Sequence, residues 1–179
     1  MHLEYRFAGV GGQGAILAGA IFASCMINYE GKHAIQSPSY TAAVRGGPTK
    51  VDVIVDDDPI LFPRATKIDM MLSFQQKAFN TFASNLKEDA VIVADKDLNP
   101  DIKEGDNIFL LPFYRIAKES LGKLQVANVI ALGAIYAVTK PVSEESLRNA
   151  IKNRVPPAFV ELNMNAFDIG VEKIQKLLK

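Results

Sequence analysis

The sequence is poor in the residues on which several kinds of protein depend. Its 179 residues include one cysteine and two histidines. One cysteine forms no internal disulfide, and by itself it cannot hold an iron–sulfur cluster or a structural zinc ion. His2 and His33 lie in no pattern typical of a metal site, and no nucleophile is paired with a base. We therefore expect this chain to bind other molecules, with no catalytic residues and no metal of its own.

The sequence also lacks an excess of either charge and any long apolar run. Twenty basic residues balance 20 acidic ones, and the absence of a Lys/Arg cluster argues against a nucleic-acid or anionic-membrane surface. The two most apolar runs, AILAGAIFASCMI and VANVIALGAIYAV, are too short to cross a bilayer. The start, MHLEYRF, does not have the pattern of a signal peptide. We expect a cytoplasmic protein in which Cys25 is a small core residue.

Strand-like and helix-like segments alternate along the chain. This order predicts an α/β fold, a Rossmann-like three-layer sandwich with a mainly parallel sheet, helices on both faces and a helical C-terminal part. We expect one domain over residues 1–179. The predicted strands cover residues 3–8, 33–35, 50–55, 67–74, 89–95 and 107–112. The predicted helices cover residues 15–29, 76–86, 114–122, 126–140 and 143–154, and residues 158–179 are predicted to form one last helix or a helix pair. Residues 36–49 are predicted to form a long loop because proline and glycine interrupt them.

The first turn is rich in glycine. Gly9, Gly11 and Gly14 have the G-x-G-x-x-G spacing, and Gly12 adds a further glycine. The motif follows a predicted strand and precedes a predicted helix, where backbone N–H groups and the helix dipole favour a phosphate. A tight turn whose glycines serve packing is the alternative.

Features that usually accompany such a loop in nucleotide enzymes are missing. The second predicted strand ends at Gln36 and Ser37, with no acidic residue for a ribose. A Walker lysine followed by Ser or Thr is also absent after the glycines. These absences argue against NAD and against a P-loop.

A second polar cluster falls in the predicted loop at residues 36–49. It offers hydroxyl groups, an arginine suited to phosphate or carboxylate, and glycines that permit close approach. We expect it to lie beside the glycine loop and to form an anion-binding cleft with it. In the alternative, Arg45 pairs with the acidic turn at residues 56–58 and Tyr40 packs on the core. The candidate residues are Ser37, Ser39, Tyr40, Thr41, Arg45, Gly46 and Gly47.

The predicted helices at residues 15–27 and 126–138 have almost no polar face. A helix that is apolar all round is either buried in the core or covered by another subunit. Both readings stay open from the sequence. If a subunit normally covers these helices, the chain alone is expected to self-associate, to a homodimer for example.

Five segments together resemble the gamma subunit of 2-oxoacid:ferredoxin (or acceptor) oxidoreductases. They are GVGGQGAILAG, EGKHAIQSPSY, RGGPTKVDVIVDDDPILFP, NVIALGAIYAV and LNMNAFDIG, so the resemblance covers nearly the whole chain. The form QSPSY and the chain length are more similar to the 2-oxoglutarate or branched 2-oxoacid enzymes than to the indolepyruvate enzymes. The resemblance assigns Gly9, Gly11, Gly12, Gln13 and Gly14 to a first binding loop and Ser39, Tyr40, Arg45, Gly46 and Gly47 to a second, and it places Asn128 and Gly133 on a packing helix.

The resemblance implies a reaction and a set of partners. A 2-oxoacid and coenzyme A give an acyl-CoA, CO₂ and reduced ferredoxin or flavodoxin. Thiamine diphosphate and iron–sulfur clusters would lie on alpha, beta and ferredoxin-like delta subunits, and this chain would pack on them and help to handle coenzyme A. The sequence departs from the family where Thr41, Ala42 and Ala43 replace the usual Gly, Pro and Glu. A free-standing Rossmann-type nucleotide enzyme and a small-ligand regulatory or scaffold protein are the competing hypotheses.

Overall fold

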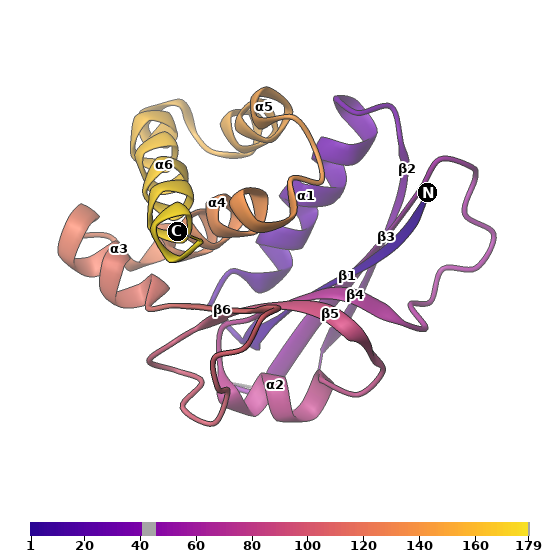
Figure 1. Ribbon diagram of the computed structural model, residues 1–179. Helices are drawn as coiled ribbons and strands as arrows, with labels where there is room; N and C mark the ends of the chain where they lie inside the picture. Colours follow the sequence, from indigo (N-terminus) through magenta and orange to yellow (C-terminus); the bar gives the residue numbers. More distant parts are fainter. Residues whose placement is uncertain (41–45, 179) are drawn as a thin grey trace.

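The computed structural model describes residues 1–40 and 46–178, and it places six strands in one sheet (Figure 1). The spatial order of the strands is β2-β3-β1-β4-β5-β6. Their bounds are β1 His2–Val10, β2 His33–Tyr40, β3 Pro48–Asp56, β4 Ile68–Ser73, β5 Leu86–Asp95 and β6 Ile108–Leu111. All six predicted strands are present, and β1, β2, β3 and β5 extend beyond their predicted bounds.

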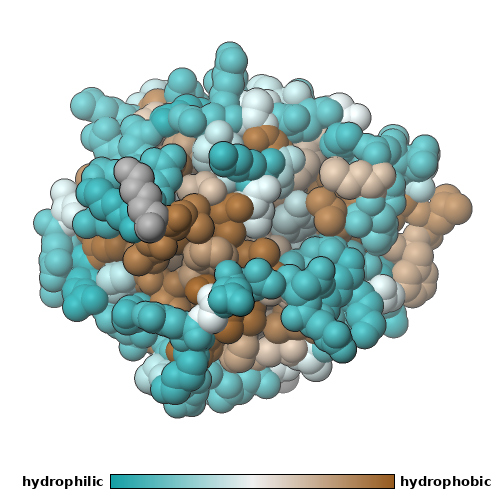
Figure 2. All heavy atoms as spheres, viewed as in Figure 1, coloured by the Kyte–Doolittle hydropathy of each residue, from teal (hydrophilic) through white to brown (hydrophobic). Residues whose placement is uncertain are grey.

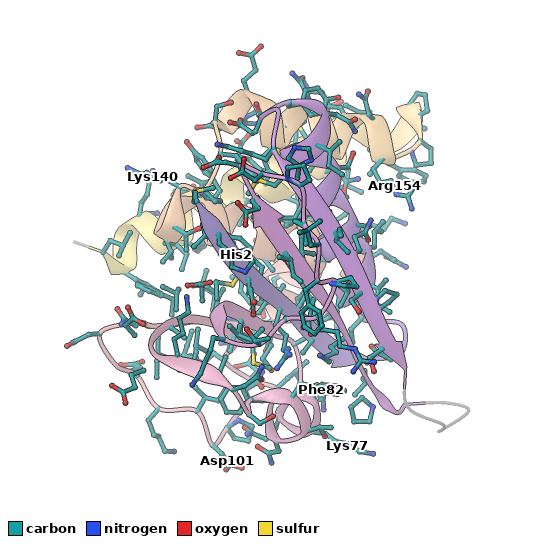
Figure 3. All side chains as sticks on the ribbon, turned by 90° about the vertical axis from the view of Figure 1, so that its right-hand side faces the viewer. His2, Lys77, Phe82, Asp101, Lys140 and Arg154 are labelled. Carbon is teal, nitrogen blue, oxygen red and sulfur yellow. The ribbon has the colours of Figure 1, made fainter. Side chains whose placement is uncertain are left out.

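Helices lie on both faces of the sheet, but unequally. Figure 1 shows the short helix α2 alone on one face and the other helices gathered on the opposite face. Figure 3 gives a second view, in which Lys140 and Arg154 label the helical layer and Lys77 and Phe82 label α2, with the sheet between them. The helices are α1 Ala15–Asn28, α2 Gln76–Phe82, α3 Phe113–Leu121, α4 Ala127–Thr139, α5 Glu144–Arg154 and α6 Val160–Leu177, with short 3₁₀ turns at Leu124–Val126 (η1) and Pro157–Phe159 (η2).

The sheet is mainly parallel, as predicted, with one reversed strand. The pairs β1–β4, β4–β5 and β5–β6 are parallel, whereas β3 runs antiparallel to both β1 and β2. Only residues 41–47 separate β2 from β3. A parallel connection needs a crossover of a dozen or more residues, so β3 returns beside β2 in the opposite direction.

The predicted loop at residues 36–49 is wrong at both ends. β2 continues to Tyr40, and β3 begins at Pro48. Pro38 suggested a loop, but β2 is an edge strand, where the missing N–H of a proline need not break a ladder. Ser37 and Ser39 therefore lie on a strand, in register with Asp52 and Lys50.

The apolar helix α4 is buried between the sheet and α6. Ten of its residues are buried, so the core reading is confirmed for this helix. Glycines let the two helices touch through their backbones. A Cβ atom at Gly170 would lie 2.0 Å from the carbonyl oxygen of Ile130, and one at Gly133 would lie 2.3 Å from that of Phe167.

The surface retains several exposed apolar side chains. On α1, Leu17 and Ile27 are 38% and 49% exposed, and in the β3–β4 loop Leu61 is 94% exposed. Figure 2 shows brown spheres at the right edge, where this loop lies in Figure 1, and a larger hydrophobic area near the C-terminus. Among the described residues, none of the helices combines the length and the apolar character that a membrane span requires.

Candidate functional site

The turn between β1 and α1 has the predicted strand–loop–helix context. Gly12 and Gly14 have φ angles of +90° and +78°, a region that residues with a Cβ rarely adopt. Gly14 is the N-cap of α1, and no side chain caps this helix end. Free N–H groups and the helix dipole therefore favour an anion at this point.

Hydrogen bonds of Gln13 stabilise the conformation of the glycine loop. Its Oε1 accepts a hydrogen bond from the Val10 N–H at 2.8 Å, and its Nε2 donates to Gln75 Oε1 at 3.1 Å. The hydroxyl of Tyr114 donates to the Gln13 carbonyl oxygen at 2.8 Å. The side chain of Gln13 thus holds the loop in shape, and the glycines supply the open backbone.

The glycine loop and the start of β3 come together at a small pocket. Loop residues, the first turn of α1 and Thr49 line this pocket of about 190 Å³. A Cβ atom at Gly11 would lie 4.0 Å from the backbone N of Gly46, and Val10 is in register with Pro48. Gly46 and Gly47 therefore lie beside the first loop, and we name this the glycine-loop pocket.

The two strand serines face away from this pocket. Side chains alternate between the two faces of a strand, and cross-strand partners share a face. Ser37 and Ser39 are in register with Asp52 and Lys50, while Thr49, one residue before Lys50, lines the glycine-loop pocket. The structure thus places both serines on the α2 face of the sheet, apart from the glycine loop.

The rest of the second cluster lies outside the described residues. This applies to Thr41, Arg45 and the side chain of Tyr40. In the alternative interpretation, Arg45 pairs with the acidic turn at residues 56–58. In the structure, Asp57 of this turn is paired with other groups. Asp57 accepts from the Lys32 ammonium and from the amino terminus, and Lys32 chiefly lowers the pKa of Asp57 to about 2.

Asn128 is a candidate that the sequence patterns did not identify. It lies in the first turn of α4, is only 4% exposed and adjoins the glycine loop. A Cβ atom at Gly14 would meet the Asn128 Nδ2 at 2.9 Å. The available signal is one carboxamide at the start of an otherwise apolar run, on a helix to which the family resemblance gives a packing role.

Burial shifts three ionisable groups near the core toward their neutral forms. Burial raises the pKa of the Cys25 thiol to about 12, and burial likewise raises the pKa of Tyr114. Burial also raises the pKa of Asp95, whose carboxylate accepts hydrogen bonds from the N–H groups of Asp97, Leu98 and Tyr114. Within residues 1–40 and 46–178, no cluster of three His, Cys, Asp or Glu side chains is arranged to hold a metal ion.

Residues 4–173 match the model of the family described as pyruvate ferredoxin/flavodoxin oxidoreductase. The chain belongs to this family. Its relatives include the 2-oxoglutarate synthase subunit KorC of Methanocaldococcus jannaschii, with 38% identity over 180 residues. That alignment covers 99% of this chain and 96% of the relative. The family resemblance found in the sequence motifs is confirmed.

Solved structures show the same fold. The gamma subunit of a keto/oxoacid ferredoxin oxidoreductase from Geobacter sulfurreducens PCA superposes with a TM-score of 0.88 and 41% identity, covering 98% of each chain. The 2-oxoglutarate:ferredoxin oxidoreductase of Magnetococcus marinus, solved with 2-oxoglutarate, coenzyme A and succinyl-CoA bound, gives a TM-score of 0.81. At 23% identity that second similarity concerns the fold, and it covers 98% of this chain and 31% of the longer one.

Proposed function

We propose that the chain is the gamma subunit of a thiamine-diphosphate-dependent 2-oxoglutarate:ferredoxin oxidoreductase. The observation that carries this proposal is the similarity to KorC over almost the full length of both chains. The complex would convert 2-oxoglutarate and coenzyme A into succinyl-CoA and CO₂ and pass the electrons to ferredoxin or flavodoxin. The chain alone would be inactive.

We assign the redox and carbanion chemistry to partner subunits. A single buried cysteine with a raised pKa cannot hold an iron–sulfur cluster. Alpha and beta subunits would hold thiamine diphosphate, and a ferredoxin-like delta subunit would hold the clusters. The exposed Ile27 and Leu61 are apolar enough to contribute to such contacts.

We assign part of the coenzyme A site to this chain. The uncapped N-terminus of α1 and the backbone of Gly11, Gly12 and Gly14 favour a phosphate group. Gly46 and Gly47 adjoin this loop, and Arg45 precedes them in the chain. Coenzyme A is a bound ligand in the Magnetococcus marinus enzyme. Ser37 and Ser39 lie on the α2 face, so we propose them as binding residues only for a ligand or a partner subunit that contacts that face.

Reconstitution tests the proposed activity. The alpha, beta and delta subunits would be co-purified with and without this chain, and ferredoxin reduction measured with 2-oxoglutarate, pyruvate or a branched 2-oxoacid. We expect CoA-dependent reduction that is fastest with 2-oxoglutarate and that requires this chain. Full activity without the chain, or failure of the chain to join the complex, would contradict the proposal.

Arg45→Ala tests the coenzyme A assignment within the same complex. Loss of a charge-assisted phosphate contact of about 1.5–3 kcal/mol should raise the KM for coenzyme A roughly tenfold or more. The KM for 2-oxoglutarate should not change. Arg64→Ala, at an exposed position in the β3–β4 loop, is the matched control. Equal effects of the two variants would contradict the assignment.

A further inference from the structure

A groove runs between the helices next to the glycine-loop pocket. It has a volume of about 380 Å³ and lies between α1, α4, η2 and α6. Small-molecule sites are typically concave, mainly apolar and equipped with a few polar groups. The lining matches this description, with apolar side chains including Leu17, Val129, Phe159 and Leu162. We name it the α1–α4 groove.

The groove contains a buried polar side chain without a partner. Asn128 lines it and is only 4% exposed, and its carboxamide forms no hydrogen bond with any residue that the structure describes. Burying an amide without a partner is unfavourable, and the large majority of buried polar side chains are paired. The neighbouring Asn163 follows that rule, because its Nδ2 donates to the Phe159 carbonyl oxygen at 2.8 Å. Asn128 therefore lacks a partner that can both donate and accept.

The groove adjoins the glycine-loop pocket. Leu17 lines both of them, and Asn128 lies against Gly14, the N-cap of α1. Lys123 also lines the groove and adds a positive charge to it. One end of an occupant would thus meet the positive end of a helix, and its middle would cross apolar side chains and one carboxamide.

We propose that the α1–α4 groove holds the pantetheine chain of coenzyme A, with the carboxamide of Asn128 paired to one of its secondary amides. The inference rests on the proposed coenzyme A role of the glycine loop. Pantetheine alternates apolar groups with amides that both donate and accept. The phosphate-bearing part of coenzyme A would lie at the glycine-loop pocket, next to Leu17, which lines both sites.

The test separates the two halves of the ligand. Coenzyme A, pantetheine and adenosine 3′,5′-bisphosphate would each be titrated into the full chain, with amide NMR shifts and calorimetry as readouts. Pantetheine is expected to shift the groove residues, and the bisphosphate to shift the glycine loop. Asn128→Leu should weaken pantetheine and coenzyme A about tenfold, while leaving bisphosphate binding unchanged.

A second variant, at a partly exposed position, tests the groove without changing a buried residue. Leu17→Glu places a carboxylate in the first turn of α1, where it favours the helix and repels a phosphate-bearing ligand. Coenzyme A binding should fall by more than about tenfold. Ile27→Glu, at an exposed apolar position on the same helix and outside the groove lining, is the matched control and should bind as the unmodified chain does.

The outcomes distinguish the inference from the function on which it rests. In one outcome, pantetheine shifts the groove residues and the bisphosphate does not shift the glycine loop. This outcome would support the groove as the pantetheine site and contradict the glycine loop as the phosphate site. Bisphosphate binding with no pantetheine response at millimolar concentration would overturn the groove. Leu17→Glu that blocks assembly with the alpha and beta subunits, while coenzyme A binding to the chain is unchanged, would make the groove a protein contact and also overturn the inference.

Discussion

The two faces of the sheet differ in the pairing of one buried polar side chain. On the α2 face, Arg6 and Asp52 are buried side by side, and their atoms have partners throughout. On the helical face, Asn128 is equally buried and has none among the described residues. A paired network stabilises the fold by itself, whereas an unpaired group indicates that something else completes it. We therefore expect a ligand to bind at the helical face.

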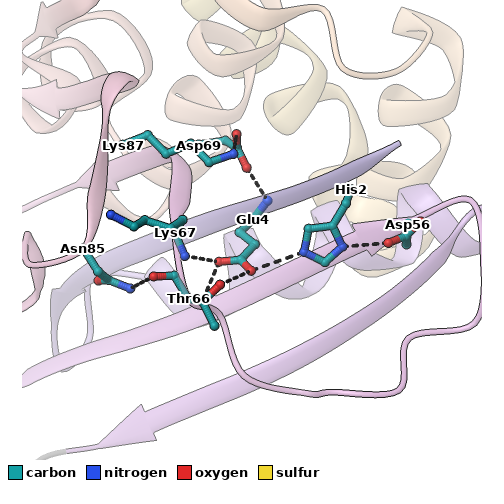
Figure 4. Close-up of polar contacts among 8 residues, drawn as sticks. All are labelled: His2, Glu4, Asp56, Thr66, Lys67, Asp69, Asn85 and Lys87. Carbon is teal, nitrogen blue, oxygen red and sulfur yellow. Dashed lines mark hydrogen bonds and ion pairs between the residues drawn. The ribbon is translucent and has the colours of Figure 1, made fainter.

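The α2 face illustrates complete pairing. The guanidinium of Arg6 donates twice to the Asp52 carboxylate, at 2.7 and 2.9 Å, and also to the Phe82 carbonyl oxygen at 2.7 Å. Figure 4 shows the adjoining polar cluster, in which the Glu4 carboxylate accepts from the N–H of Lys67 at 2.7 Å and from the Thr66 hydroxyl at 3.2 Å. This cluster joins β1 to the segment before β4.

Breaking the buried ion pair should have the largest effect. Arg6→Met leaves the Asp52 carboxylate buried, with Lys50 as its one remaining cationic partner among the described residues, and such changes cost about 3–5 kcal/mol. Urea unfolding would measure the loss. The double variant Arg6→Met/Asp52→Leu removes both charges and should recover much of the stability. Equal stability of Arg6→Met and the unmodified chain would refute the role given to this pair.

A larger side chain at the contact between α4 and α6 tests the packing of the helical face. Gly170→Ala places a methyl group against the Ile130 carbonyl oxygen, so the helices must move apart. We expect a loss of about 1–3 kcal/mol, as in other overpacked cores, together with a lower melting temperature. Gly105→Ala, where the added Cβ meets only ordinary contacts with Ile108, is the control and should change little.

Two buried asparagines allow the most direct comparison of the faces. Asn99 Oδ1 accepts from the Ser73 hydroxyl, and its Nδ2 donates to the carbonyl oxygens of Ser73 and Asp95. Asn99→Leu should therefore cost about 1–3 kcal/mol, because it leaves these groups unpaired. Asn128→Leu removes a group that has no described partner, and it should be neutral or stabilising by up to about 1 kcal/mol. Similar losses at both positions, measured by urea unfolding, would show that Asn128 is structurally satisfied.

The sequence predicted the elements with strong local signals. Glycines at fixed spacing located the first loop, and the continuous apolar pattern located α1 and α4. The predicted start of the helix at residue 143 is confirmed, since Ser143 is the N-cap of α5 and its Oγ accepts from the Ser146 N–H at 3.1 Å. These signals reside within a few consecutive residues, so no tertiary information is needed to read them.

The errors arose where distant segments decide the outcome. Pro38 suggested a loop, and only its place on an edge strand explains why β2 continues past it. The face to which Ser37 and Ser39 belong depends on their register with β3. The unpaired state of Asn128 depends on every neighbour that packs around it. None of these properties can be read from a single segment.

The smallest predicted effect lies at the solvent edge of the α2 face. His2 hydrogen-bonds to Asp56 at 2.6 Å and to Glu4 at 3.2 Å, and these contacts raise its pKa. A raised folded-state pKa stabilises the fold fully below the unfolded value, about 6.5, and this contribution is lost as the pH rises through the folded value. The His2 side chain is 52% exposed, so water screens most of the effect. Urea midpoints should fall slightly from pH 6 to pH 8, and His2→Gln should abolish that slope, whereas His33→Gln should keep it. If the urea midpoint of His2→Gln still falls between pH 6 and pH 8, a titrating group other than His2 causes the pH dependence.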